Sequence, residues 1–427
     1  LASGATQSGF GRTGTVDWQT GDIKTAAFIP ATGKGYFVNT TGGAVTVNLP
    51  AGSAGDIVGL KDYAGTWDSY AVTLNPNGSD KIGGGADADP TLESEGGAVL
   101  LVYVDGTQGW LTTAESVTTS PSGVQSFVAA TGGTVATVCT NYKTHTFTSP
   151  GTLVVTCGGN AAGSNTVDYF VVAGGGGGGG RSSAGGGGAG GFRLSNSTCM
   201  SAPLTSPLAT PTAVPVTATP YAITVGGGGP GGAGGCTPAF GTSGSDSIFS
   251  SITSAGGGGG GCWPNPGPSN GLAGGSGGGG GGPGGSGGAG DTPPTTPDQG
   301  FAGGDGGGGG CAGGGGGGAA AVGANASPPN CGGDGGIGSF VVQTGFGGCN
   351  GTPGPVPSTR YFAGGGGGRS GSGNSSGGAG GGGAGASNCS GMTAGATNSG
   401  GGGGASGGAG TGSNGGSGIV IIRYKFQ

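Results

Sequence analysis

Cysteine is the residue type in this chain that is best able to form covalent bonds or bind a metal. The chain contains nine cysteines but a single histidine, His145. No two cysteines form a C-x-x-C pair, so the ligand spacing of a structural zinc site is missing and we expect no metal. Thiols in a chain with little side-chain core to bury them favour disulfides. The pairs that we favour are Cys139 with Cys157, which flank a predicted hairpin, and Cys331 with Cys349.

The acidic residues and the histidine do not form a recognisable catalytic set. A glycosidase needs two carboxylates close together, but the acids of residues 117–427 are scattered aspartates, and Asp298 and Asp305 are the best candidates for a pair. A Ser-His-Asp triad would have to use His145, which stands in the alternating run THTFT, where a packed imidazole is expected. A phosphate-binding loop needs Gly-Lys-Ser/Thr, and no lysine lies in a glycine tract. We expect neither an enzyme nor a cofactor.

Composition sets this chain apart from an ordinary globular protein. Glycine (125 residues) and proline (25 residues) form about a third of its 427 residues, which without a period indicates low complexity or disorder. Collagen is excluded because uninterrupted glycine runs such as 174–180 break its Gly-X-Y repeat. Charged residues make up only 7% of the chain, with a net charge of −6 and no basic stripe, so we expect no nucleic-acid partner. No apolar run reaches about 18 residues, so we expect no membrane insertion.

Residues 1–116 have the pattern of an all-β module. Short apolar runs recur about every ten residues, at 35–41, 44–50, 56–63, 70–78 and 98–106. In AVTVNL, Val45, Val47 and Leu49 share one face of a strand. Turn pairs such as Asn77-Gly78 separate the runs, and no stretch has helical periodicity. The pattern predicts a small β-sandwich or barrel.

The pattern of residues 117–427 predicts a second β-module, which contains most of the glycine. Its clearest strands are VDYFVVA (167–173), YAITVG (221–226) and the closing GIVIIRYKF (418–426). The closing run is apolar without alternation, which is typical of a strand covered on both faces. We expect it to pair with VDYFVVA in one sheet of a small β-sandwich. The glycine tracts of residues 174–417 are then insertions that extend from this sheet.

The glycine tracts alternate with short loops that contain aromatic residues and cysteines, which flexible linkers rarely carry. We therefore expect polyglycine II, the extended helix with three residues per turn and a rise of about 3.1 Å per residue. Ordering one glycine costs roughly 1–2 kcal/mol, whereas one net hydrogen bond returns about 1 kcal/mol. A lone helix of this kind does not form, so we expect the tracts to lie side by side in a bundle anchored by the β-module.

Several of these segments resemble a known family. VDYFVVAGGGGGGG (167–180), YAITVGGGG (221–229) and GGSGIVIIRYKFQ (415–427) resemble the glycine-rich C-terminal domain of tail-fibre-like proteins of marine bacteriophages, especially cyanophages. THTFTSPGTLVVT (144–156) is similar to the opening hairpin of that domain, and residues 33–67 to the β-module that often precedes it. The bundle is also similar to the distal adhesins of T-even-type phages, in which polyglycine II helices form a sandwich and tip loops contact the host. This chain differs from those adhesins in its many cysteines.

The resemblance implies an extracellular fibre protein or adhesin of a virion tail. It would attach to a glycan or an outer-membrane component of the host cell surface, and it would be a homo-oligomer, for which a trimer is favoured. The alternative is a structural subunit that self-assembles into an extracellular filament or sheath.

A polyglycine bundle offers almost no side chains, so specificity has to lie in the loops between its tracts. The richest loops are 262–270, 291–301 and 355–362, which combine prolines with aromatic or polar residues. Proline lowers the conformational entropy that a loop loses on binding. Aromatic rings in these loops can stack on sugars, and an arginine can donate hydrogen bonds to them. The predicted receptor-binding residues are Trp263, Phe301, Arg360, Tyr361 and Phe362.

Overall fold

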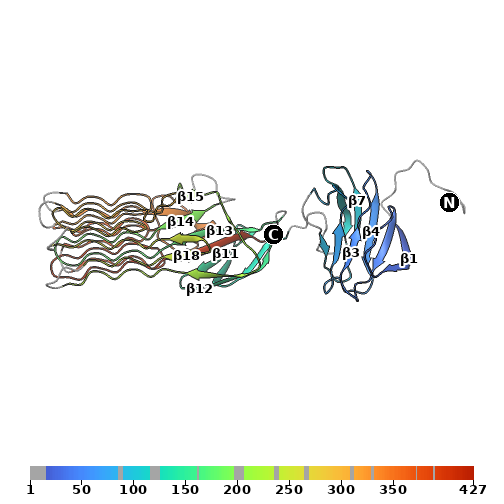
Figure 1. The fold of residues 1–427 in the computed structure, drawn as a ribbon. Coiled ribbons are helices and arrows are strands. Elements are labelled where there is room, and N and C mark those ends of the chain that lie inside the picture. Colours follow the sequence, from blue (N-terminus) through green and yellow to red (C-terminus); the bar gives the residue numbers. More distant parts are fainter. Residues whose placement is uncertain are drawn as a thin grey trace. The chain divides into compact units, whose positions relative to one another are not determined.

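The structure, a computed structural model, describes residues 16–84, 90–115, 126–160, 163–196, 206–234, 240–263, 269–307, 312–327, 331–371, 373–387 and 390–427. The chain divides into two compact units, Leu1–Gln125 and Ser126–Gln427. The predicted all-β fold class is confirmed (Figure 1). Apart from a short π-helical segment, η1 (Gln343–Gly347), the regular elements of the described residues are strands.

The first unit is built from a larger and a smaller sheet. The larger sheet contains, in order, β1 (Asp17–Lys24), β2 (Lys34–Val38), β4 (Ile57–Asp62), β7 (Ala98–Tyr103) and β8 (Trp110–Glu115). The smaller sheet contains β3 (Val45–Asn48), β5 (Val72–Asn75) and β6 (Thr91–Leu92). The chain crosses repeatedly from one sheet to the other, so β2 and β4 are parallel, as are β3 and β5.

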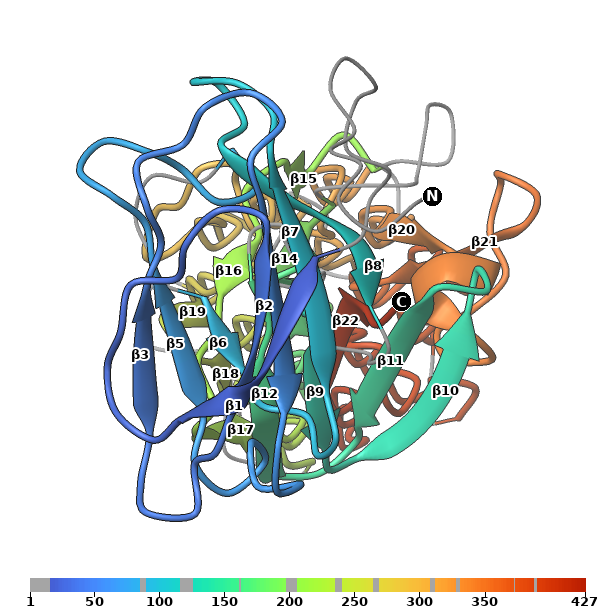
Figure 2. The same cartoon turned by 90° about the vertical axis from the view of Figure 1, so that its right-hand side faces the viewer.

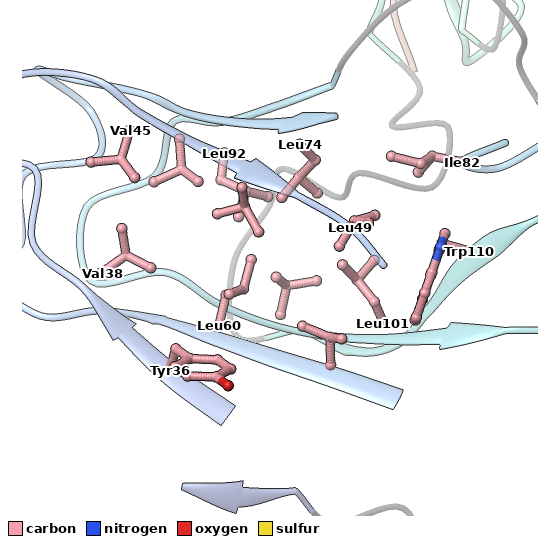
Figure 3. Packing of buried hydrophobic residues seen from close by; sticks show 14 of the residues in the cluster. Tyr36, Val38, Val45, Leu49, Leu60, Leu74, Ile82, Leu92, Leu101 and Trp110 are labelled. Atoms are coloured by element: carbon pink, nitrogen blue, oxygen red, sulfur yellow. The ribbon is translucent and has the colours of Figure 1, made fainter. Parts of the chain in front are cut away.

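Both sheets of the first unit contribute to one hydrophobic core (Figure 3). The predicted alternation in AVTVNL is confirmed, because Val45, Val47 and Leu49 are at most 2% exposed. They pack with Leu60 of the larger sheet and Leu74 of the smaller one. The core therefore depends on the two-residue period of the strands, in which alternate side chains face the same side.

The second unit also has two main sheets. One has the order β10 (Thr134–Val138), β11 (Tyr142–Phe147), β22 (Ile419–Lys425), β13 (Thr166–Val172), β14 (Phe192–Ser195) and β15 (Ala209–Thr210), and β16 (Val214–Pro215) pairs with β13. The other has the order β19 (Ile252–Ser254), β18 (Ser247–Phe249), β17 (Pro220–Thr224), β12 (Gly151–Gly158) and β9 (Val128–Thr131). Figure 2 shows β11 between β10 and β22.

Strands β13 and β22 form the centre of this unit. Their predicted pairing in one sheet is confirmed over Asp168–Val172 and Ile419–Arg423, and the structure shows that it is antiparallel. One face packs against the β12 and β17 sheet through residues such as Tyr169 and Ile422. The opposite face packs through Phe170 and Ile421 against the hairpin of β20 (Ser339–Val342) and β21 (Thr359–Phe362) and against η1. Both strands are thus covered on both faces, as their continuous apolar sequences predict.

The same strand pair carries a buried ion pair. The Arg423 guanidinium donates to the Asp168 carboxylate at 2.6 Å and to the Asn196 side-chain oxygen at 3.1 Å, and Arg423 is only 1% exposed. Its charge lies 4.5 Å from the ring centroid of Phe346 in η1. A buried charge needs such partners to offset its desolvation, and the contact of Arg423 with Phe346 links η1 to the sheet.

His145 is fully buried and has a structural role. Its Nδ1 lies 2.6 Å from the Gly132 carbonyl oxygen and its Nε2 lies 3.0 Å from the Tyr424 hydroxyl. The carbonyl can only accept, so Nδ1 carries the proton and Nε2 accepts from Tyr424. Burial lowers the pKa of His145, which outweighs the opposing effect of the Gly132 hydrogen bond. The packed imidazole expected from the alternating strand is what the structure shows.

The two predicted disulfides are wrong, since Cys139, Cys157 and Cys349 are free thiols. Cys139 lies in the turn between β10 and β11, whereas Cys157 lies on β12 in the facing sheet. Cys331 pairs through its backbone with Ser327 at the start of a glycine tract, whereas Cys349 follows η1 beside the sheets. The two cysteines of each predicted pair thus lie in different layers, or at opposite ends, of the unit.

The glycine tracts are ordered and packed side by side, as predicted, and extend from one end of the sheets (Figure 1). Tract 185–191 lies at the centre. One turn of it donates backbone hydrogen bonds of 2.8–3.0 Å to residues on different tracts, Gly314, Gly403 and Gly258. The same turn accepts bonds of 2.8 Å from further tracts, through Gly279, Gly366 and Gly176. The central tract is therefore bonded in six directions, and we call the surrounding tracts 174–180, 255–262, 276–282, 312–318, 363–369 and 400–406 the inner tracts.

The remaining tracts form an outer layer with a three-residue rhythm. In tract 226–234, residues 226, 229 and 232 are buried, whereas 227, 230 and 233 are exposed. This period is the helical repeat of polyglycine II. It explains why Pro230 and Ala233 are accommodated there, since both stand on the solvent side.

Side chains of the outer layer cap backbone groups that lack a neighbouring tract. Asn414 accepts from the N–H of Gly231 at 3.0 Å, Asp305 from Gly287 at 2.9 Å, and Asp334 from Ser376 at 2.6 Å. Thr393 and Thr411 act in the same way on Ala384 and Gly234. Unpaired backbone donors are costly, so these polar residues complete the surface of the bundle.

Glycine at the centre of the bundle cannot be replaced. A Cβ on Gly187 would lie closer to the Gly176 carbonyl oxygen than van der Waals contact allows, whereas a Cβ on the exposed Gly227 would meet nothing within 4 Å. We predict that Gly187→Ala destabilises the second unit by about 3 kcal/mol or more, from overpacking, and that the matched control Gly227→Ala changes its stability by less than about 0.5 kcal/mol. Guanidinium unfolding followed by circular dichroism measures both. Equal effects of the two substitutions would contradict close packing of the tracts.

Stability should depend on pH through His145. Because its pKa is lowered in the folded state, the unfolded chain takes up a proton below about pH 6.5 that the folded chain does not. Stability is therefore complete above that pH and falls as the pH drops, by at most about 1.4 kcal/mol per pH unit. Urea unfolding between neutral pH and pH 5 measures the slope. His145→Gln should flatten it, and an unchanged slope in this variant would assign the pH dependence to other groups.

Candidate functional site

The candidate site is the end of the bundle remote from the sheets, which we call the loop end. Its described turns are 181–183, 282–284, 369–371 and 407–410, together with Trp263. Backbone hydrogen bonds link these turns to one another. Arg181 donates to Gly410 at 3.0 Å, Gly282 to Ser183 at 2.8 Å, and Arg369 to Ala184 at 2.8 Å. Separate loops are thus fixed into one continuous face.

Trp263 belongs to this face. It follows the inner tract 255–262 and is partly exposed. Its ring lies directly over Gly282, where a Cβ would clash with it. Gly282 also has a positive φ of 54°, so glycine is favoured there both for its backbone conformation and for the space it leaves. The indole therefore packs on a backbone turn and keeps part of its surface open.

Two arginines also lie at the loop end, each directly after the glycine run of an inner tract. Arg181 has a positive φ of 77°, and its backbone bond to Gly410 sets it beside the turn 407–410. The Arg369 guanidinium donates to the carbonyl oxygen of Ser387 at 3.4 Å. Both residues are partly exposed. An indole and two guanidinium groups are suited to sugar stacking and to hydrogen bonding with anionic or hydroxyl groups.

The structure does not bring the predicted receptor-binding residues together. Of the five, only Trp263 lies at the loop end. Phe301 begins a tract beside the sheets, where its N–H donates to Gly318 at 3.0 Å. Tyr361 and Phe362, 4% and 0% exposed, belong to β21. Arg360 on the same strand donates to the carbonyl oxygens of Cys349, Asn350 and Gly351.

The physical reason is that loops 291–301 and 355–362 close the sheet side of the bundle. The rings of Phe362 and Phe170 meet at 4.8 Å in an edge-to-face arrangement. In the other loop, Asp291 accepts from the backbone N–H of Thr295 and Gln299, each at 3.1 Å. Gln299 is buried and accepts from Ala255 at 2.8 Å. Both loops are therefore held by the scaffold on the sheet side, away from the loop end.

Arg181 and Arg369 were missed by sequence reasoning, although a signal for them exists. Each stands in the sequence Gly-Gly-Arg-Ser after an unbroken glycine run, at 179–182 and 367–370. This repeated pattern marks the point where an inner tract ends. Within the described residues there is no group of three metal-ligating side chains. The same residues include no helix with the length and apolar character needed to span a bilayer.

The fold and the loop end together define a β-scaffold protein that carries an ordered polyglycine bundle. The sequence model of the glycine-rich domain matches residues 148–425, and the chain belongs to this family. The match covers most of the second unit, from the strands that support the bundle to β22. No curated protein matches the chain.

The assignment of β21 to the scaffold can be tested by its effect on stability. We predict that Phe362→Ala destabilises the second unit by about 3–5 kcal/mol, because it removes a fully buried aromatic ring. The matched control Val322→Ala truncates a side chain that is 59% exposed on an outer tract and should change stability by less than about 0.5 kcal/mol. Chemical denaturation of the full chain measures both. A near-neutral Phe362→Ala would restore this residue as a candidate for partner binding.

Proposed function

We propose that this chain is an adhesin or tail-fibre protein of a virion, which attaches to a host cell surface through the loop end of its glycine bundle. The observation that carries the proposal is the arrangement of the second unit. Its tracts are bonded to one another through their backbones, while turns that carry side chains are joined to one another at the far end. A rigid shaft with a loop-bearing end is the form required of an attachment protein.

The flanks of the bundle are less suited to recognition. Their polar side chains, such as Asn414, Asp305 and Asp334, are engaged as caps of neighbouring backbone groups. The inner tracts are buried. Discrimination among partners needs exposed side chains, and Trp263, Arg181 and Arg369 at the loop end are each partly exposed.

The resemblance to phage tail-fibre-like proteins supports the same function and supplies its setting. In this proposal the protein is extracellular and virion-borne, and its partner is a glycan or an outer-membrane component of the host. It acts as a homo-oligomer, with a trimer favoured, because fibres generally close with cyclic symmetry. No catalysis is required of it.

Cell adsorption tests this function. The fluorescently labelled full chain is incubated with a panel of cyanobacterial strains, and bound fluorescence is measured by flow cytometry. We predict that Trp263→Ala lowers binding to responsive strains by about tenfold or more, as expected when an aromatic anchor of a small contact is removed. The melting temperature should stay within about 2 °C of the parent, because the ring is only partly buried.

Val322→Ala serves as the control, since it changes an exposed residue away from the loop end. Unchanged adsorption of a folded Trp263→Ala protein would remove the loop end as the receptor site. Electron micrographs of the purified protein separate the alternative function, because an endless polymer in place of discrete particles would favour the filament or sheath.

A further inference from the structure

Strand β10 lies at the edge of its sheet, and its outer side has no neighbouring strand among the described residues (Figure 2). Its inner side pairs with β11, from Thr134 opposite Thr146 to Val138 opposite Tyr142. No backbone hydrogen bond from any other described segment reaches β10. An edge strand of this kind presents a row of free N–H and C=O groups, to which another extended segment can bond.

The side chains of β10 contribute little to the core of their own chain. Thr134, Val135, Ala136 and Thr137 are exposed and Val138 is only partly buried, whereas four of the six residues of β11 are buried. Val135 alone is 51% exposed. Four of the five residues of β10 are nevertheless β-branched, a type that stabilises strands by packing against cross-strand neighbours. The composition of β10 is therefore typical of a strand with neighbours on both sides.

Edge strands are usually protected from further pairing by charged side chains, proline or a bulge, and β10 has none of these. Its register with β11 is regular, and residues 126–142 contain neither a charged residue nor a proline. This neutrality favours a second copy as the partner, because like charges that face each other across two strands would repel. The nearest charge, Lys143 on β11, would be at least about 14 Å from its equivalent, three strand spacings away, where exposed charges are largely screened.

The backbone fixes both ends of β10, so the strand is extended before it meets a partner. Gly132 and Gly133 turn the chain from β9 into β10 with positive φ angles of 111° and 62°. At the other end, Cys139 and Thr140 have φ angles of 47° and 65°, and the Asn141 N–H donates to the Cys139 carbonyl at 2.7 Å. A strand that is already in its bound conformation loses little conformational entropy on association.

We propose that β10 of one copy pairs with β10 of a second copy in antiparallel orientation, so that the sheets of two second units become one. In the register that pairs all five residues, Ala136 lies opposite its own equivalent on a twofold axis, and Val135 lies opposite Thr137 of the second copy. The inference goes beyond the proposed function, which needs a homo-oligomer but does not define its contact. A twofold contact gives a dimer, whereas a trimer closes through two unlike surfaces, so the oligomeric state separates the two.

Sedimentation equilibrium of the full chain over a wide range of concentration measures the association, and we expect monomer and dimer for the parent. Val135→Lys and Val135→Glu each place like charges at diagonal positions about 7–8 Å apart across the axis, so each should weaken dimerisation about tenfold or more. An equimolar mixture of the two variants places opposite charges there and should restore the dimer. The matched control is Val154→Lys, at a 39% exposed position of β12 that is paired on both sides, and it should leave the dimer unaltered.

Hydrogen exchange of the parent chain gives a test that does not depend on the folding of a variant. The outward-facing amides of β10 should exchange more slowly at high protein concentration than at low concentration, whereas the amides bonded to β11 should not change. A parent chain that stays monomeric, a trimer, or a dimer that Val135→Lys leaves intact would overturn the pairing. Adsorption that needs Trp263 in a chain that stays monomeric would refute this inference and keep the adhesin, whereas a dimer that adsorbs to no strain would do the reverse.

Discussion

Close contact between backbone carbonyl oxygens and glycine Cα atoms is the constraint on which the second unit depends. At most positions of the inner tracts, the place that a Cβ would take is occupied by the carbonyl of a neighbouring tract. Hydrogen bonds of 2.8–3.0 Å between tracts require this approach. The predominance of glycine follows directly, since a side chain at most of these positions would meet that carbonyl. Apart from small residues such as the buried Ala189 of the central tract, residues with side chains lie at tract ends, on the solvent side of outer tracts and in loops.

The constraint also explains why the bundle needs its β-scaffold. Ordering a glycine costs roughly 1–2 kcal/mol, and one net hydrogen bond per residue offsets about 1 kcal/mol of that. The bundle gains little from hydrophobic burial, which supplies most of the stability of ordinary domains. The scaffold supplies it through two apolar clusters on opposite faces of β13 and β22. The tracts lie between these two strands in sequence, so the pairing of β13 with β22 holds the two ends of the inserted segment together. This restricts the conformations that the tracts can adopt before they pack, and so lowers the entropy that they lose when they become ordered.

The parts of the fold that can be predicted from sequence are those with strong local patterns. The continuous apolar runs of β13 and β22 predict their burial and pairing, and the alternation of Val45, Val47 and Leu49 predicts the core of the first unit. The sequence does not predict at which end of the bundle a given loop lies. The chain changes direction at every turn between tracts, so the end depends on the number of turns that precede the loop. The run 273–290 contains two reversals, near Ser276 and at 282–284, and neither interrupts the glycine for more than a residue or two. Glycine adopts positive φ without strain, as at Gly282 and Gly284, so a turn leaves no mark in the sequence. The loops 291–301 and 355–362 were accordingly grouped with Trp263, although they lie at the other end.

The separation of scaffold and loop end has a consequence for how recognition can change. The bonds that join the central tract to the inner tracts run between backbone atoms, so they place no demand on the side chains of the connecting turns. A turn at the loop end has to keep its end positions, such as the backbone bonds of Arg181 and Arg369, but its remaining residues can vary without loss of bundle energy. Loops near the sheets lack this freedom, because their side chains fill the core around Phe170 or cap the tracts, as Gln299 does. The physical basis of stability and that of specificity therefore lie in different atoms, backbone in the shaft and side chains at its end, and a binding face can diversify on a shaft that stays constant.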